Sequence, residues 1–312
     1  MPVTLNKIGK VARSISAFAK EFSRPRTLVQ TPLPAAKTPS IGIALGGGFA
    51  RGLAHIGVLK VFEEEGIPIS FVAGTSVGSV IGAAYCSGIS AKELEEIAGL
   101  VRFKHFARWT ISRLGIASND RMVPFLRKVV KARTFEELKI PLAVAATDFV
   151  TGDAVVFRSG ELIDPVRASC AYPGMFLPVN INGRLLIDGL LGHAVPTVPL
   201  REMGADRVLA VYLSAHWVNL NGPRHIFDVI GQCFSIAQQK MCGLWEGSAD
   251  VIVTPDVKGF SYDGFDRAKE LIAAGEMVAR AALPKIKSWM VEPQPQPIAT
   301  KVPAISPAAL KA

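Results

Sequence analysis

The residues with the clearest chemical potential are Gly74-Thr75-Ser76-Val77-Gly78, a Gly-x-Ser-x-Gly motif. The motif follows an apolar run at residues 69–73, which we expect to be a strand, and it precedes a helical segment. A serine that acts as a nucleophile must stand clear of the backbone on a tight, strained turn, and flanking side chains would collide across that turn. The motif therefore predicts a nucleophile at Ser76, with Gly74 and Gly78 as the glycines of the turn. The alternative is a purely structural glycine turn.

A second glycine-rich segment, Gly46-Gly47-Gly48-Phe49-Ala50-Arg51-Gly52, lies between a predicted strand at residues 41–45 and a helix. Glycines before a helix let backbone N–H groups converge on an anion, either a phosphate or the oxyanion formed during ester hydrolysis. A dinucleotide-binding fingerprint would need glycine in place of Arg51, and the Gly-Lys-Ser/Thr of a P-loop is absent from this segment. Because the Ser76 motif follows one strand–helix unit later, we interpret the segment as an oxyanion hole.

A nucleophilic serine also needs a base, and histidine is the usual one. His193 follows a glycine turn and is a candidate, whereas His55 lies on the helix after the glycine-rich segment and is expected to support packing. Asp188 ends a predicted strand, where a partly desolvated carboxylate can accept the serine proton directly. The pattern alone hardly distinguishes Asp188 from His193 as the candidate base.

The elements that position these residues form an alternating pattern of short apolar runs and helical segments from residue 40 onwards. This alternation predicts an α/β fold in which a mostly parallel sheet has helices on both faces. The expected strands are residues 41–45, 69–73, 142–147, 154–157, 179–181, 184–187, 208–213 and 251–253. Asn182-Gly183 is a hairpin signal between two of these strands.

The composition, 49% hydrophobic and 20% charged over 312 residues, excludes a disordered chain and a coiled coil. The cysteines form no Cys-x-x-Cys pair, which indicates reduced thiols and no metal site. Residues 66–91 are uncharged and long enough to span a bilayer, but they hold five glycines and five serines and are better explained as strand, turn and buried helix. We expect no transmembrane helix, no secretory signal and a cytoplasmic location.

Residues 1–38 carry seven basic residues and one acidic residue, and so account for most of the net charge of +9. Their apolar residues recur at helical spacing, at Leu5, Ile8, Val11, Ile15, Phe18 and Phe22. A Pro-rich stretch follows. This pattern predicts an amphipathic helix and a linker; the helix either lies on the anionic inner face of a membrane or packs on its own domain. A basic segment on a near-neutral body does not indicate a nucleic-acid partner.

The motifs in combination resemble the patatin-like phospholipases. The similarity is carried by the glycine-rich segment extended through residue 59, by the Ser76 motif and by Asp188-Gly189, which occur in the order typical of that family. Residues 166–176 also resemble the family segment that precedes its catalytic aspartate. The resemblance covers residues 41–255 and is strongest toward the bacterial members and the neuropathy-target-esterase type of catalytic domain.

The resemblance implies a three-layer α/β/α fold and a serine–aspartate dyad, with Ser76 as nucleophile and Asp188 as base. It implies that Gly46, Gly47 and Gly48 form the oxyanion hole and that Arg51 supports this loop. The implied activity is hydrolysis of a phospholipid, lysophospholipid or other fatty acyl ester through an acyl-enzyme, without a metal or cofactor. The implied organisation is a catalytic domain at residues 39–285, with its core motifs within 41–200, between the basic segment 1–38 and a Pro-rich flexible tail at 286–312.

One residue departs from the family pattern. The family usually has Gly or Ala after Asp-Gly, and this chain has Leu190. A larger side chain there is expected to narrow or reshape the pocket. The alternative function is therefore a non-catalytic regulatory or lipid-binding scaffold with the same fold.

Overall fold

The structure is a computed structural model of the 312-residue chain. It describes residues 38–110, 112–214, 222–223 and 226–291, all within one compact unit that begins at Thr38. The predicted N-terminal helix and residues 292–312 of the predicted tail lie outside the described residues.

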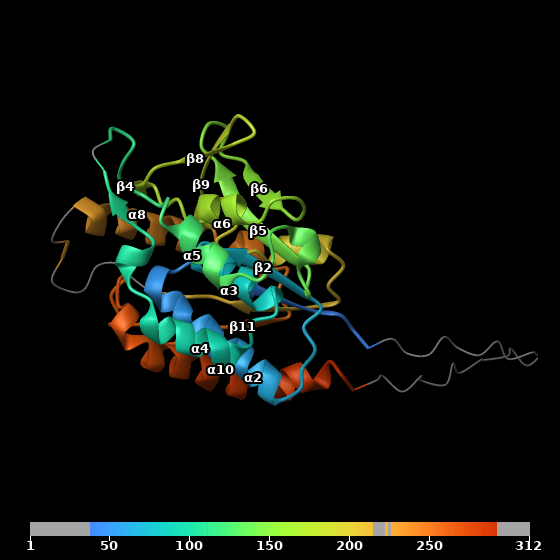
Figure 1. The fold of residues 1–312 in the computed structure, drawn as a ribbon. Coiled ribbons are helices and arrows are strands. Elements are labelled where there is room, and N and C mark those ends of the chain that lie inside the picture. Colours follow the sequence, from blue (N-terminus) through green and yellow to red (C-terminus); the bar gives the residue numbers. More distant parts are fainter. Residues whose placement is uncertain (1–37, 111, 215–221, 224–225, 292–312) are drawn as a thin grey trace, which may run out of the picture. The chain divides into compact units, whose positions relative to one another are not determined.

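Eight strands in the described part of the chain form one central sheet (Figure 1). They are β1 (Ile41–Leu45), β2 (Phe71–Thr75), β5 (Leu142–Asp148), β6 (Ala154–Phe157), β8 (Val179–Ile181), β9 (Arg184–Asp188), β10 (Arg207–Val211) and β11 (Val251–Val253). Their order is β11–β10–β1–β2–β5–β9–β8, and β6 also pairs with β5. The strands from β11 to β5 are parallel, whereas β6 and β9 are antiparallel to β5 and β8 is antiparallel to β9.

Helices cover both faces of this sheet. They are α2 (Ala54–Glu64), α3 (Val77–Cys86), α4 (Ala91–Leu100), α5 (Met122–Val129), α6 (Ile163–Ser169), α7 (Thr197–Glu202), α8 (Ile226–Lys240), α9 (Gly243–Glu246) and α10 (Ala268–Ser288). Ile43 and Leu45 of β1 share a core with α2, α3, α4 and α10, while Ala44 faces the other way and packs with Leu200 of α7 and Trp245 of α9. Every residue of β1 and β5 is buried, as expected for strands covered on both sides. The predicted α/β fold is confirmed.

The bounds of β2 differ from the prediction. We expected residues 69–73, but pairing with β1 begins at Phe71, opposite Gly42. The strand then continues through Gly74 and Thr75 because both residues pair with β5. The apolar pattern could not show this extension, since glycine and threonine do not continue an apolar run.

A second, small sheet was not predicted. It consists of β3 (Arg108–Trp109), β4 (Gly115–Ser118) and β7 (Gly174–Phe176), where β3 and β4 form an antiparallel hairpin and β7 is parallel to β4. Strands of two to four residues are too short to show a periodic pattern. Figure 1 shows this hairpin extending away from the central sheet, and α8 contacts β7 of the same small sheet.

The boundary expected between the domain and its tail, at residue 285, falls inside α10. This helix continues past Pro284 to Ser288. Ile286 is fully buried and Trp289 is nearly so. Proline in a helix interior removes one backbone hydrogen bond. We infer that burial of these two large side chains offsets that loss, and residues 286–291 therefore belong to the folded unit.

Candidate active site

Ser76 lies on a strained turn between β2 and α3, as its motif predicted. Its backbone has φ 54° and ψ −126°, a conformation that costs energy for a residue with a side chain. A Cβ on Gly74 would lie 2.5 Å from the Gly78 carbonyl oxygen, and one on Gly78 would lie 2.1 Å from the Leu45 oxygen. Both flanking positions therefore require glycine. The Ser76 N–H donates to Ser169 Oγ at 2.8 Å, which ties the turn to α6.

The pairing of β5 explains why Ser76 and Asp188 meet. The first part of β5 pairs with both β2 and β6, and its later part pairs with both β6 and β9. Because a strand has only two edges, β2 and β9 must share the edge opposite β6. Thr75 pairs with Ala145 and Asp188 pairs with Ala146, so the ends of the parallel strand β2 and the antiparallel strand β9 meet head-on.

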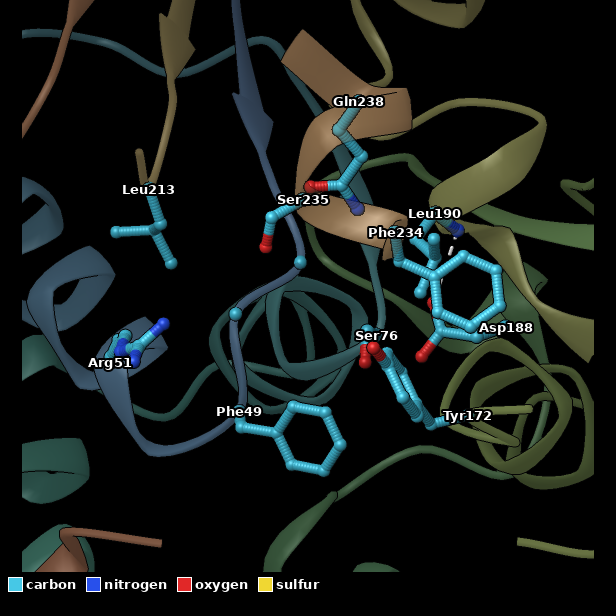
Figure 2. Close-up of a pocket in the computed structure, with 12 residues that line it drawn as sticks. Phe49, Arg51, Ser76, Tyr172, Asp188, Leu190, Leu213, Phe234, Ser235 and Gln238 are labelled. Atoms are coloured by element: carbon cyan, nitrogen blue, oxygen red, sulfur yellow. Dashed lines mark hydrogen bonds between the residues drawn. The ribbon is translucent and has the colours of Figure 1, made fainter. Parts of the chain in front are cut away.

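Asp188 is a buried carboxylate, and among the described residues only one of its two oxygens accepts a hydrogen bond. Oδ1 accepts the Leu190 N–H at 3.1 Å, whereas Oδ2 has no hydrogen-bond partner among the described residues. Burial raises the pKa of Asp188 to about 7, against a smaller lowering by the nearby Ser76 hydroxyl and the Leu190 N–H. Figure 2 shows the carboxyl group directed toward Ser76. The hydroxyl therefore lies near the carboxylate without closing a hydrogen bond on Oδ2.

The glycine-rich loop leaves one backbone amide for an anion. The N–H of Gly46 donates to the Val211 oxygen and that of Gly47 donates to the Ala194 oxygen, both at 3.2 Å. Within the described part of the chain, the Gly48 N–H has no hydrogen-bond partner. Of the three glycines that we expect to form the oxyanion hole, Gly46 and Gly47 thus use their N–H groups within the fold, and Gly48 keeps an N–H without a partner among the described residues.

His55 and Arg51 each form a side-chain hydrogen bond with a backbone carbonyl oxygen. His55 Nε2 donates to the Gly46 oxygen at 2.8 Å, and burial lowers the pKa of His55 to about 4, so the ring is neutral near pH 7. Arg51 Nε donates to the Phe260 oxygen at 2.9 Å. The role of Arg51 in supporting an oxyanion hole stays a prediction. The His55 contact is with a backbone oxygen of the loop and does not indicate that His55 acts as a base.

A polar pocket of about 460 Å³ contains both candidate catalytic residues (Figure 2). It is lined by Gly47, Gly48, Phe49, Arg51, Ser76, Tyr172, Asp188, Leu190, Leu213, Phe234, Ser235 and Gln238. Sequence reasoning missed the contribution of α8, which supplies Phe234, Ser235 and Gln238, because no motif marks that helix. Tyr172 lies within residues 166–176, which we singled out for their resemblance to the family but not for this role.

An apolar pocket of about 490 Å³ meets the polar pocket at Ser76. It is lined by Phe49, Ser76, Val77, Val80, Phe103, Phe106, Met122, Cys170, Phe176 and Phe265. A group bound at Ser76 thus has an aromatic and aliphatic environment on one side and a carboxylate, an arginine and polar side chains on the other. This division suits a molecule with an apolar chain joined to a polar part.

His193 is separated from this arrangement. His193 lines a third pocket, of about 540 Å³, and Ser76 is not among the residues that line it. Burial lowers its pKa. The His193 backbone oxygen accepts the Thr75 hydroxyl at 2.6 Å, so this segment braces the turn before Ser76 through its main chain. The geometry therefore favours Asp188 over His193 as the partner of Ser76.

Leu190 forms part of the wall between the polar pocket and the third pocket. Its side chain is buried in a cluster with Tyr172, Met175 and Phe176. The Leu190 N–H, which any residue but proline would supply, orients Asp188. The substitution changes the pocket wall and leaves the Ser76–Asp188 arrangement in place.

The described residues contain neither a metal-binding cluster nor a membrane-spanning helix. In the described part of the chain, no three His, Cys, Asp or Glu side chains cluster as metal ligands would. Across the same residues, every helix is too short or too polar to cross a bilayer. Residues 66–91 form β2 and α3, as expected.

The family model of the patatin-like phospholipases matches residues 43–201, about half of the chain. The chain belongs to this family. The crystal structure of VipD from Legionella pneumophila shares the fold, with a TM-score of 0.50 at 13% identity over 80% of this chain and 67% of that one.

Members of the patatin-like phospholipase family with related sequences occur in bacteria and fungi. An uncharacterized NTE family protein of Mycobacterium tuberculosis is 36% identical over 197 residues, which is 59% of this chain and 53% of that protein. Lysophospholipase NTE1 of Mycosarcoma maydis is 32% identical over 232 residues, which is 70% of this chain and 12% of that protein. This chain therefore spans about half of the mycobacterial relative and a small part of the fungal one.

Proposed function

We propose that this chain is a carboxylic ester hydrolase that removes fatty acyl groups from phospholipids or lysophospholipids, with Ser76 as nucleophile and Asp188 as base. The observation that carries the proposal is the position of Ser76, on a strained turn where a buried carboxylate and an apolar pocket meet. Membership of the family, and a relative named as a lysophospholipase, support a lipid ester as the substrate.

The acylation step uses the available oxygen of Asp188. A base is most effective when its pKa lies near the working pH, and burial brings the pKa of Asp188 to about 7. The Ser76 hydroxyl gives its proton to Asp188 Oδ2 as Oγ attacks the acyl carbonyl carbon. The Gly48 N–H stabilises the resulting oxyanion. When the intermediate collapses, the bond to the alcohol breaks, the alcohol takes the proton from Asp188, and the acyl group stays on Ser76.

Deacylation repeats these steps with water. Water gives a proton to Asp188 and attacks the acyl-Ser76 carbonyl, and the second intermediate expels Ser76 Oγ, which regains its proton. The free fatty acid leaves. The proposal requires no metal or cofactor, because the dyad supplies both the nucleophile and the proton transfers.

The two pockets divide the substrate between them. The apolar pocket suits the acyl chain, since its lining is almost wholly aromatic and aliphatic. The polar pocket suits the polar part of the ester and the attacking water, and it contains Arg51. We also propose that the basic amphipathic pattern of residues 1–38 brings a cytoplasmic enzyme to an anionic membrane surface.

The test combines covalent labelling with product analysis. Wild type is expected to react with a fluorophosphonate probe and to release fatty acid from lysophospholipid, and Ser76→Ala is expected to do neither while remaining folded. Ser235→Ala removes another serine that lines the same pocket and is expected to remain labelled. Labelling of Ser76→Ala would contradict the assignment of the nucleophile. A folded wild type without labelling or fatty acid release would favour the scaffold alternative.

A further inference from the structure

The β3–β4 hairpin carries two large apolar side chains that face solvent. Trp109 is 68% exposed and Leu114, in the connection before β4, is 63% exposed. Single exposed apolar residues are ordinary, but two on one projecting hairpin indicate an interaction surface. Tryptophan is favoured where a protein meets a membrane, because its ring is apolar and its N–H is polar.

The hairpin and its surroundings are strongly basic. Residues 100–119 contain four basic residues and no acidic residue, and these four are Arg102, Lys104, Arg108 and Arg113. All four are exposed. Asp120 forms ion pairs with Arg108 at 3.0 Å and Arg167 at 3.2 Å, so this acid is already shared between two guanidinium groups. Among the described residues, no ion pair forms at Arg102, Lys104 or Arg113, and apolar side chains beside such cations are complementary to an anionic lipid surface.

Aromatic rings connect the exposed hairpin to the apolar pocket. The ring centroid of Trp109 lies 6.5 Å from that of Phe103, which in turn lies 6.3 Å from that of Phe176. Phe103 and Phe176 both line the apolar pocket that reaches Ser76. The exposed tryptophan is therefore the outer end of an apolar path that leads to the candidate nucleophile.

Helix α8 adds a second exposed apolar surface near the hairpin. Three apolar residues of this helix are exposed, and their spacing places them on one face: Ile226, Val229 and Ile236. Another face of α8 lines the polar pocket. The helix contacts β7, which pairs with β4. The exposed apolar residues of α8 thus belong to a helix that contacts the small sheet of the hairpin.

We propose that the β3–β4 hairpin, with Trp109 and Leu114 at its exposed surface, docks this chain on anionic lipid bilayers. When the chain is docked in this way, the apolar pocket faces the acyl layer, because the aromatic path connects the pocket to Trp109. The second statement rests on the proposed function for its substrate, whereas docking requires no catalysis. The surface is separate in sequence from the basic segment 1–38.

The first test measures vesicle binding of the full chain. The probes are sedimented vesicles of equimolar phosphatidylcholine and phosphatidylglycerol, with pure phosphatidylcholine for comparison. The double variant W109S/L114S is expected to bind the anionic vesicles about tenfold more weakly or worse than wild type, with unchanged thermal unfolding. Met277→Ser is the matched control, because Met277 is 73% exposed on α10, away from the hairpin, and its loss is expected to change nothing (Figure 1).

The charge requirement is tested separately. The double variant K104E/R113E keeps both apolar side chains and reverses two exposed cations. Because residues 1–38 keep their basic residues, this variant is expected to show a smaller preference for anionic over neutral vesicles than wild type does. Wild-type binding is expected to weaken as salt rises. Equal binding of wild type to the two kinds of vesicle would overturn the proposal.

Fluorescence reports on Trp109 directly. Brominated phosphatidylglycerol is expected to quench wild type more than Trp109→Phe, which keeps an apolar ring and is expected to remain bound. Undiminished vesicle binding by W109S/L114S, or equal quenching of wild type and Trp109→Phe, would overturn docking through this hairpin. A higher KM of W109S/L114S than of wild type for a soluble short-chain ester would also overturn it, because the hairpin would then be part of the substrate pocket.

The same experiments separate docking from catalysis. Ser76→Ala is expected to bind vesicles as wild type does, although it hydrolyses nothing. Retained activity in that variant contradicts the proposed function, and its vesicle binding still decides the docking proposal.

Discussion

Replacing Asp188 by asparagine is expected to abolish activity and, at alkaline pH, to stabilise the protein. Burial raises the pKa of Asp188 from the ordinary 3.8 to about 7, so the folded state holds this proton more tightly than the unfolded chain does. Wild type therefore loses stability as pH rises from about 3.8 to about 7, and the loss is complete above that range. Asparagine keeps the shape of the side chain without the charge.

The size of the effect follows from the two pKa values. A tenfold change in proton affinity corresponds to about 1.4 kcal/mol, so the ionised carboxylate costs about 4 kcal/mol of the free energy of unfolding at pH 8.5. At pH 5 the cost is less than half as large, because the folded carboxyl is still protonated. The stability of Asp188→Asn relative to wild type should therefore increase by about 3 kcal/mol between pH 5 and pH 8.5. Any fixed cost of the new amide is the same at both pH values and cancels.

Urea unfolding of both proteins at the two pH values measures this difference. Asp148→Asn is the matched control, because the Arg184 guanidinium, 2.8 Å away, holds the pKa of Asp148 below its ordinary value. That carboxylate is ionised at both pH values in both states, so its replacement should show no change between them. A relative stability of Asp188→Asn that does not rise with pH would refute the inference that Asp188 is a buried, costly carboxylate.

Three other perturbations have defined outcomes. His193→Ala should keep most of the ester hydrolase activity, since this residue lines a different pocket, and loss of activity as complete as in Ser76→Ala would indicate a triad. Gly78→Ala should yield little folded protein by circular dichroism, because its Cβ would lie 2.1 Å from a backbone oxygen, and a normal melting curve would show that the turn tolerates a side chain. Deletion of residues 1–38 should lower activity on anionic vesicles but not on a soluble short-chain ester, and a fall in melting temperature instead would indicate that the segment packs on the domain.

The nucleophile turn could be predicted from the sequence because its requirements are local. Glycine at positions 74 and 78 reflects contacts within a few residues of Ser76 and with the neighbouring strand, and a five-residue motif records them. The choice between Asp188 and His193 was not local. It depends on which strand edge β9 occupies, and the apolar pattern of a strand carries no information about its neighbours.

The oxyanion loop shows the same limit. The sequence marks three consecutive glycines, but their amides differ in availability because Val211 and Ala194, far along the chain, engage two of them. The small sheet and the pocket-lining face of α8 were missed for a related reason. Both consist of short or amphipathic segments whose positions are decided by tertiary contacts.

The head-on meeting of β2 and β9 on β5 has a consequence for how the site tolerates change. Main-chain hydrogen bonds to β5, and not the shapes of core side chains, set the relative position of Ser76 and Asp188. Substitutions that alter core volume can shift helices without separating the two residues. A slip of one residue between β5 and β9, by contrast, would turn the Asp188 side chain to the opposite face of the sheet. Bulges or insertions in residues 142–148 are therefore the changes that would most damage the proposed dyad, even though no residue of that strand touches the substrate in the proposed reaction.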